Sequence, residues 1–192
     1  MPYRARIVRS TLLSAALGLV LPVGSPGAPL LAQSATGEAP FGDKVSERIL
    51  MYHRASPTVG TAGPLGRLGI IEAKSVGFRA ILNLAATTVA AGQDDRAMAE
   101  FTLLRYFNVP VASLPSDEQV REIRRIVEDP TNAPILIYGQ QDQAAAAWAL
   151  VRAAGGMPPE FALQEGKTAG LRQLLAPVQE RLGIRATAPP QR

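Results

Sequence analysis

The chain has 192 residues, with 20 basic and 16 acidic side chains, one histidine and no cysteine. This length suits one domain with its own hydrophobic core. Without cysteine there can be no disulfide bond and no thiol chemistry, and a lone histidine without other ligands nearby argues against a zinc site, so we expect no metal and no other cofactor.

The first 32 residues have the composition of a secretory signal peptide. Three arginines precede the apolar run 11–23, which is too short to span a bilayer comfortably and has no stop-transfer pattern. We expect cleavage after Ala32, with Ala28 as the alternative site, and a periplasmic or secreted mature protein. An uncleaved amphipathic anchor is the competing interpretation.

Loss of this signal removes much of the apparent basicity. Residues 1–32 contain three arginines and no acid, so their removal lowers the formal net charge from +4 to +1. A near-neutral domain with scattered charges has no electrostatic footprint for nucleic acid or an anionic membrane. We therefore expect no nucleic-acid partner and no stable membrane insertion after cleavage. An unknown protein or a small polar ligand remains as a partner.

After the signal, composition divides the chain into three parts. Residues 33–42 are small and polar and predict a flexible leader, residues 43–183 form the domain, and residues 184–192 predict a disordered tail.

Strand and helix signals alternate along the domain. In its first half we expect a short helix (45–50), an edge strand (58–62), a helix (68–76), a buried strand (80–84) and a helix (94–104). Gly77 is a plausible residue to end the helix before it.

The second half has the clearer boundaries. A strand at 105–111 is followed by a helix whose capping box pairs Ser116 with Gln119, and this helix ends at Asp129. The later expected elements are a strand (135–138), an alanine-rich helix up to Gly155, a helix opened by Pro158 and Pro159, and an apolar helical stripe (171–182) that Pro177 splits into two pieces. The alternation predicts an α/β layer fold with a mainly parallel sheet.

Residues 133–156 carry the signal of a binding cradle. The short strand 135–138, the polar loop 139–143 and the alanine-rich helix follow one another directly. Backbone N–H groups converge where such a loop meets a helix N-terminus, and the helix dipole favours an anion there. In parallel sheets this carboxyl end of the strands is where ligands bind.

An ordered set of segments resembles a known family. The segments are HRASPTVGTAG (53–63), GFRAILNL (77–84), LLRYFNVPV (103–111), NAPILIYG (132–139), PEFALQEG (159–166) and KTAGL (167–171). They are similar to the bacterial cysteine-phosphatase-like domain of beta-lactamase-hydrolase-like proteins, a branch of the dual-specificity and tyrosine phosphatase superfamily. The resemblance runs from Ser46 to Leu182 and implies a three-layer α/β/α fold around a central, mainly parallel sheet of four to five strands.

The residues that carry the family's chemistry are absent from this sequence. In the family, a cysteine thiolate attacks phosphorus while a loop arginine holds the phosphate oxygens. The corresponding family positions and their residues here are histidine at Tyr138, cysteine at Gly139, loop glycine at Asp142, arginine at Ala144, a further arginine at Ala85 and a glutamine at Pro64.

These replacements predict loss of the reaction. Gly139 offers no nucleophile and Ala144 cannot make a bidentate contact with an oxyanion. Asp142 puts a negative charge where a phosphate would bind, so we expect its carboxylate to act as a loop staple or a helix cap.

Several other residues have both a functional and a structural interpretation. Asp117 could be a general acid, but a residue in the first helical turn more often supports the helix dipole. His53 could be a base, but no nucleophile is identifiable for it to serve, so a structural hydrogen bond is favoured. Trp148 is expected in the core rather than in a ligand platform. The loop glutamines, Gln140, Gln141 and Gln143, could equally bind a polar ligand or be solvated.

Three functional hypotheses follow from the sequence. The favoured one is a pseudophosphatase, an exported binding or regulatory module that keeps the fold without the reaction. A structural partner of an envelope assembly ranks second. A hydrolase with a rebuilt mechanism based on Asp142, His53 or Asp117 ranks last, because it needs an acid and a base within hydrogen-bond reach.

Overall fold

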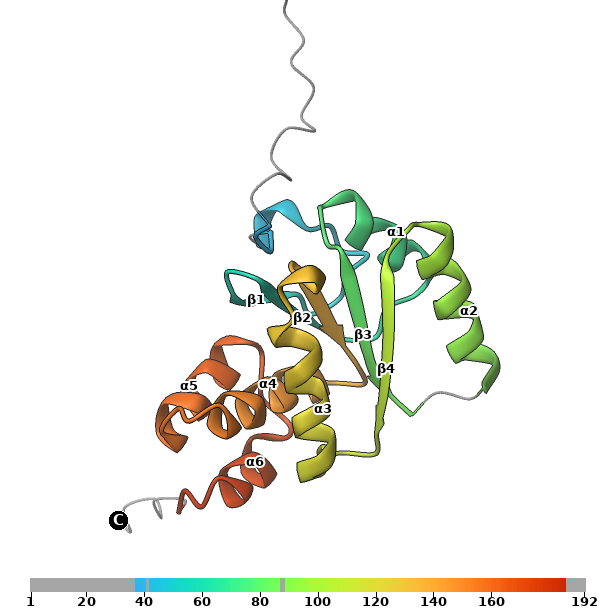
Figure 1. Ribbon diagram of the computed structural model, residues 1–192. Helices are drawn as coiled ribbons and strands as arrows, with labels where there is room; N and C mark the ends of the chain where they lie inside the picture. The colour runs from blue at the N-terminus through green and yellow to red at the C-terminus, as the bar shows by residue number, and fades with distance from the viewer. Residues whose placement is uncertain (1–36, 41, 87–88, 186–192) are drawn as a thin grey trace, which may run out of the picture. The chain divides into compact units, whose positions relative to one another are not determined.

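The structure is a computed structural model, and it describes residues 37–40, 42–86 and 89–185. Its elements, drawn in Figure 1, are η2 (Gly42–Lys44), β1 (His53–Ser56), β2 (Val59–Ala62), α1 (Arg67–Ser75), β3 (Ala80–Ala85), α2 (Val89–Phe101), β4 (Arg105–Val111), α3 (Asp117–Glu128), η3 (Pro130–Asn132), β5 (Ile135–Tyr138), α4 (Gln143–Ala154), α5 (Pro159–Thr168) and α6 (Leu175–Arg181). The predicted signal peptide (1–32) and nearly all of the predicted tail lie outside the described residues. Within the described part of the chain, no helix is both long and apolar enough to cross a membrane.

One sheet of five strands forms the centre of the domain, in the order β1-β2-β5-β3-β4. Strands β2, β5, β3 and β4 run parallel to one another, and β1 pairs antiparallel with β2. β5 lies between β2 and β3, with Leu136 level with both Gly60 and Ile81. The predicted α/β fold with a mainly parallel sheet is confirmed.

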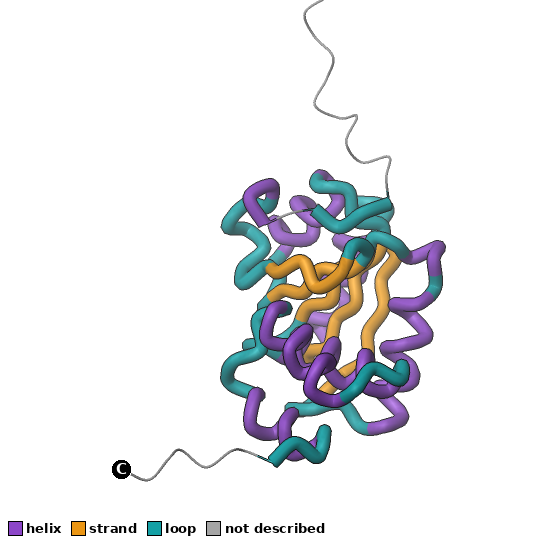
Figure 2. Tube along the Cα trace, turned by 90° about the vertical axis from the view of Figure 1, so that its left-hand side faces the viewer, coloured by secondary structure: helices purple, strands orange, loops and turns teal. Residues whose placement is uncertain are grey.

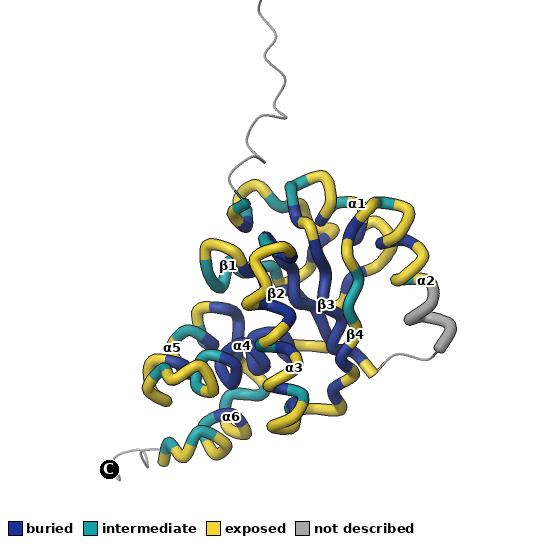
Figure 3. Tube along the Cα trace, viewed as in Figure 1, coloured by how far each residue is buried: buried dark blue, intermediate teal, exposed yellow. Residues whose placement is uncertain are grey.

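Side chains alternate between the two faces of this sheet, as the pleat requires. On β5, Ile135 and Ile137 join a core cluster with residues of α3, α4 and α5, whereas Leu136 and Tyr138 join a second cluster with residues of α1 and α2. Burial is concentrated in the strands and in α4, as the dark blue of Figure 3 shows. The sheet thus lies between α1 and α2 on one face and α3, α4 and α5 on the other, which gives three layers (Figure 2).

The strongest local signals in the sequence define the ends of the elements. The capping box of α3 is present in full, because Ser116 Oγ accepts from the Gln119 N–H while Gln119 Oε1 accepts from the Ser116 N–H. Gly77 follows α1 with φ 105°, and the N–H groups of Gly77 and Phe78 return to carbonyls of the last turn. Strand β4 has the predicted bounds.

The first half of the domain required three corrections. Residues 45–50 form turns rather than a helix. This segment packs closely on α1, because a β-carbon on Gly69 of α1 would lie 2.7 Å from the Arg48 carbonyl oxygen. β2 is not an edge strand, because the turn after Ser56 folds β1 onto its outer side. α2 spans 89–101 rather than 94–104.

The predicted split of the C-terminal stripe at Pro177 is wrong. Pro177 lies in the first turn of α6, where a residue without an N–H group is tolerated. Residues 171–174 are not helical, because the N–H groups of Arg172 and Leu174 donate to the carboxylate of Asp142.

The end of the predicted leader packs onto the domain. Ala39 is buried and its N–H donates to the Pro57 carbonyl, while the Tyr52 hydroxyl donates to the Pro40 carbonyl. These residues therefore contribute to the packed structure ahead of residue 43.

Candidate functional site

The loop from Gly139 to Asp142 joins the carboxyl end of β5 to the start of α4. Both flanking elements are buried: all four residues of β5, and α4 from Gln143 to Val151. The loop is therefore held on a rigid base at the predicted edge of the sheet. Gln140 and Gln141 are exposed, and Gln141 has a left-handed backbone with φ 48°.

Gln143 fills the inside of this loop. Its side chain is buried, its Oε1 accepts from the Gln140 N–H at 2.9 Å, and its Nε2 donates to the carbonyls of Val111 and Ala112. In a phosphate cradle, loop N–H groups of this kind point at the anion. Here one of them is already satisfied by a side chain of the protein, so Gln143 serves the loop rather than a ligand.

Gly139, the residue that the sequence resemblance aligns with the family's nucleophile, has little space around it for a larger residue. A β-carbon on Gly139 would lie 3.0 Å from Gln143 Oε1, 3.2 Å from Gln143 Cβ and 3.3 Å from Leu84 Cβ. These separations are below ordinary van der Waals contact. A side chain at this position would therefore require Gln143 and Leu84 to move by a few tenths of an ångström.

The sequence resemblance aligns Ala144 with the family's loop arginine, and neither Ala144 nor its neighbour Ala145 could take that role. Ala144 and Ala145 are both buried and pack in the core cluster of α3, α4 and α5. No residue from Gln140 to Val151 is an arginine. The start of α4 therefore provides no guanidinium for an oxyanion.

Asp142 is the loop staple that the sequence suggested, but it is not a helix cap. Its side chain is buried, and Oδ2 accepts from the N–H groups of Arg172 at 2.6 Å and Leu174 at 3.1 Å. It occupies the N-cap position of α4 without making a side-chain capping bond. The carboxylate thus ties the loop to the segment before α6, while its Oδ1 has no partner among the described residues.

His53 lies beside the same loop. Together with Thr61, Gln141, Asp142 and Gly170, it lines a cavity of about 10 Å³, which is about the space of one water. The imidazole is in close contact with Gly170, where a β-carbon would lie 2.5 Å from His53 Cδ2. Burial, and then the positive charge of Arg172, lower the pKa of His53. The structure thus brings His53 near Asp142, in a space too small for a phosphoester.

Tyr138, which the sequence resemblance aligns with the family's histidine, belongs to a partly buried polar network on the sheet face covered by α1 and α2. Its hydroxyl donates to Asp95 Oδ2 at 2.9 Å, and Asn83 Nδ2 donates to the same oxygen and to the Tyr106 hydroxyl. Burial is the main cause that raises the pKa values of both Tyr138 and Asp95. The sequence interpretation missed this network, although an asparagine inside the apolar strand 80–84 was a signal for it.

Asp117 is not part of the loop site. Its carboxylate is exposed and pairs with Arg181 of α6 at 2.6 Å. Within the described ranges there is no group of three or more His, Cys, Asp or Glu side chains that could hold a metal ion.

Comparison with known proteins identifies the fold. No protein-family model matches the chain, and no curated protein matches it. Solved structures do. A candidate phosphatase (DUF442) from Shewanella putrefaciens CN-32 matches with a TM-score of 0.58 and 18% identity, covering 71% of this chain and 88% of that one.

Two further structures agree. A candidate phosphatase from Neisseria meningitidis Z2491 gives a TM-score of 0.57 at 17% identity over 71% of this chain and 99% of its own. The core catalytic domain of the PP-IP phosphatase Siw14 from S. cerevisiae, in complex with citrate, gives 0.56 at 14% identity over 71% and 87%. The chain has the phosphatase-like fold.

Proposed function

We propose that the chain is a pseudophosphatase: an exported protein that keeps the phosphatase-like fold, has lost phosphoester hydrolysis and acts by binding. Within that fold we assign it to the beta-lactamase-hydrolase-like branch, on the ordered segments between Ser46 and Leu182. Its export rests on the basic and apolar pattern of residues 1–32.

The observation that carries this proposal is that side chains of the protein itself occupy the signature loop. The Gln140 N–H, which would face an anion, donates to Gln143 Oε1. Asp142 adds a buried carboxylate to the same loop. A phosphate dianion would have to displace Gln143 Oε1 from the Gln140 N–H and approach the negative charge of Asp142. Both phosphate binding and phosphoester hydrolysis are therefore disfavoured.

The rebuilt hydrolase has less support. Asp142 and His53 line one small cavity, but about 10 Å³ leaves no room for a substrate between them. Asp117 is engaged with Arg181 at the surface. The structural-partner hypothesis expects a closed pocket at this loop, whereas the binding module expects an open one, so the internal hydrogen bond of Gln143 is compatible with a structural partner too.

Titration of the ¹⁵N-labelled chain with inorganic phosphate and with orthovanadate tests the state of the loop. We expect no saturable shift of the Gln140 or Gly139 amide resonances at millimolar anion. The matched variant is Gln143→Ala, which removes the internal acceptor and exposes the Gln140 N–H to solvent anions. Saturable shifts of both amides in the natural chain would contradict the proposal.

A further inference from the structure

The turn between α2 and β4 presents two large apolar side chains to solvent. Phe101 is 80% exposed and Leu103 is 81% exposed, the highest values for large apolar side chains in the described part of the chain. The turn precedes the first residue of β4, so it lies at the amino end of the parallel strands, opposite the loop Gly139–Asp142. Figure 1 shows the end of α2 close to α1. Two neighbouring apolar side chains with this exposure indicate an interaction surface.

The backbone holds Leu103 in an unfavourable conformation. Leu103 has φ 59°, in the left-handed region that glycine or asparagine usually occupies after a helix. The Leu103 N–H donates to the Glu100 carbonyl and the Leu104 N–H to the Ala99 carbonyl, which is a regular helix end that glycine would form with less strain. Stability of the domain therefore does not explain a leucine here, whereas an apolar contact outside the chain would.

Four cationic side chains lie around this turn, and all four residues are exposed. Lys74, near the end of α1, donates to the Leu103 carbonyl at 3.3 Å. The N–H of Arg105, the first residue of β4, donates to the carbonyl of Arg79 at 3.0 Å. The fourth is Arg125 on α3, which acts together with Arg105 on one nearby carboxylate. The fold thus gathers cations from α1, α3 and the starts of two strands at one end of the sheet.

The acidic neighbours of these cations are Glu100 at the end of α2 and Asp129. Lys74 and Arg105 direct their side-chain hydrogen bonds to neutral oxygens, a backbone carbonyl for Lys74 and a hydroxyl and an amide oxygen for Arg105. Positive charge therefore remains in excess around the turn. The near-neutral total charge of residues 33–192 does not reveal this concentration, because a sum over the sequence carries no information on position.

Exposed apolar tips among long cationic side chains are the two elements of peripheral membrane binding. The headgroup layer of a bilayer accepts projecting apolar side chains without a preformed hollow, which a protein partner would have to provide. Lysine and arginine can lay their apolar stems on that layer while their charges meet lipid phosphates. The projection of Phe101 and Leu103 and the sign of the surrounding charge therefore favour an anionic membrane over an acidic protein.

We propose that this amino-end surface docks reversibly on an anionic phospholipid membrane without spanning it. Phe101 and Leu103 enter the headgroup layer, and the cations that contact lipid phosphates are Lys74, Arg79, Arg105 and Arg125. The docking depends neither on the state of the Gly139 loop nor on the loss of phosphoester hydrolysis.

Spin-labelled bicelles locate the contact in the ¹⁵N-labelled full chain. The bicelles contain phosphatidylcholine, phosphatidylglycerol and a lipid with a nitroxide on its headgroup. We expect the amide signals of Phe101 and Leu103 to lose intensity, while those of Gln141 at the other end of the sheet and Phe161 on α5 keep it relative to unlabelled bicelles. A uniform loss, or a loss centred on another surface, would overturn the proposal. No loss at all would reject the membrane and leave an acidic protein as the partner of this surface.

Charge reversal tests the cations by sedimentation with vesicles of phosphatidylcholine and phosphatidylglycerol in equal parts. Any lipid affinity of residues 1–32 is common to all variants, so differences between variants report the domain. Arg79→Glu combined with Arg125→Glu should weaken binding by at least about tenfold. Arg121→Glu combined with Arg185→Glu makes the same change of charge at exposed positions away from the turn and should stay within about twofold. Equal losses in the two double variants would reduce the effect to net charge and overturn the proposal.

Leu103→Gly separates docking from folding. Glycine adopts φ 59° without strain, so this variant should unfold at the same or a higher temperature, while its vesicle affinity falls about fivefold. Phe101→Ser should weaken binding similarly, whereas Phe161→Ser, at a phenylalanine that is 68% exposed on α5, should not. Unchanged vesicle binding in Leu103→Gly, or an equal loss in Phe161→Ser, would reject the surface.

Discussion

At the scale of single residues, two buried polar side chains hold the loop between β5 and α4. Gln143 turns its amide into the loop Gly139–Asp142, and Asp142 turns its carboxylate toward the backbone N–H groups of Arg172 and Leu174. Both side chains make hydrogen bonds to backbone groups of the chain. The loop is thereby stabilised by the chain itself.

Asp142→Ala tests the staple. The change leaves the Arg172 and Leu174 N–H groups without their acceptor, and we expect the free energy of unfolding to fall by about 2 kcal/mol. Urea unfolding measures this loss. Gln140→Ala, an exposed change in the same loop, should stay within about 0.5 kcal/mol of the natural chain. Equal effects of the two changes would show that the carboxylate does not hold the loop.

His53 predicts a pH dependence of stability. Its folded-state pKa is lowered from 6.5 by burial and by Arg172, so in acid the unfolded chain takes up the proton more readily than the folded chain. The stability that this group contributes is present above pH 6.5 and is lost as pH falls through 6.5 toward the folded pKa. Urea unfolding of the natural chain and His53→Gln on both sides of pH 6.5 should show their difference narrowing or reversing in acid. A pH-independent difference would contradict the assignment.

At the scale of elements, the network around Asp95 joins α2 to the sheet. Its carboxylate accepts from Tyr138 on β5 and from Asn83 on β3, two residues that lie level with each other on adjacent strands. The apolar packing of α1 and α2 on this face thus includes one polar connection. Burial of Asp95 is what makes that connection sensitive to pH.

Asp95→Asn should change this sensitivity while keeping an acceptor for Tyr138. The folded-state pKa of Asp95 is raised above 3.8, mainly by burial, so the folded chain keeps this proton longer than the unfolded chain as pH rises. The natural chain should therefore lose stability relative to Asp95→Asn between pH 3.8 and the raised pKa. Unfolding of both proteins across this window gives the comparison. A difference that stays constant would mean that Asp95 does not titrate there.

Element-scale signals also explain what the sequence could predict. Strand β4 and the cap of α3 depend on residues close in sequence, so their bounds were predictable. The turns at 45–50 and the unwound segment 171–174 depend on contacts with α1 and with Asp142, which sequence spacing does not reveal. At the site, the missing nucleophile was visible at Gly139, but the inward turn of Gln143 depends on carbonyls of Val111 and Ala112 in a distant segment.

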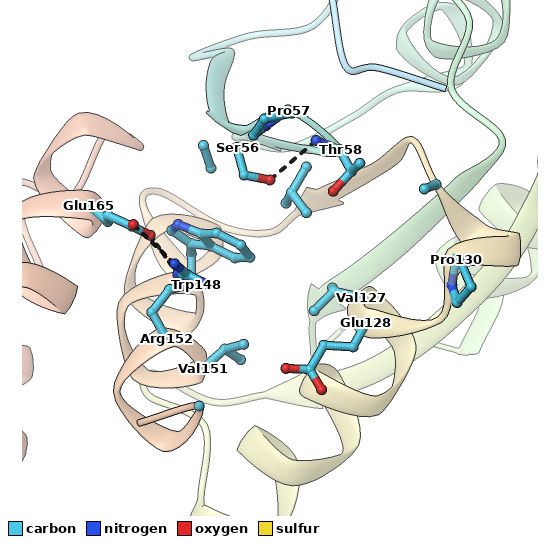
Figure 4. A pocket seen from close by; sticks show the side chains of 14 residues that line it. Ser56, Pro57, Thr58, Val127, Glu128, Pro130, Trp148, Val151, Arg152 and Glu165 are labelled. Atoms are coloured by element: carbon cyan, nitrogen blue, oxygen red, sulfur yellow. Dashed lines mark hydrogen bonds and ion pairs between the residues drawn. The ribbon is translucent and has the colours of Figure 1, made fainter. Parts of the chain in front are cut away.

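At the scale of the whole domain, the sheet has two ends with different properties. The carboxyl end, where parallel sheets usually bind ligands, has a loop closed by its own side chains. The amino end has a cavity of about 610 Å³ whose lining includes Trp148 (Figure 4).

Turnover of p-nitrophenyl phosphate by the purified chain tests the central claim most directly. We predict no release of p-nitrophenol above a buffer control, because Gly139 provides no nucleophile and the loop has no arginine. The claim is contradicted by turnover that remains with the protein through purification and is abolished in a folded Asp142→Asn variant.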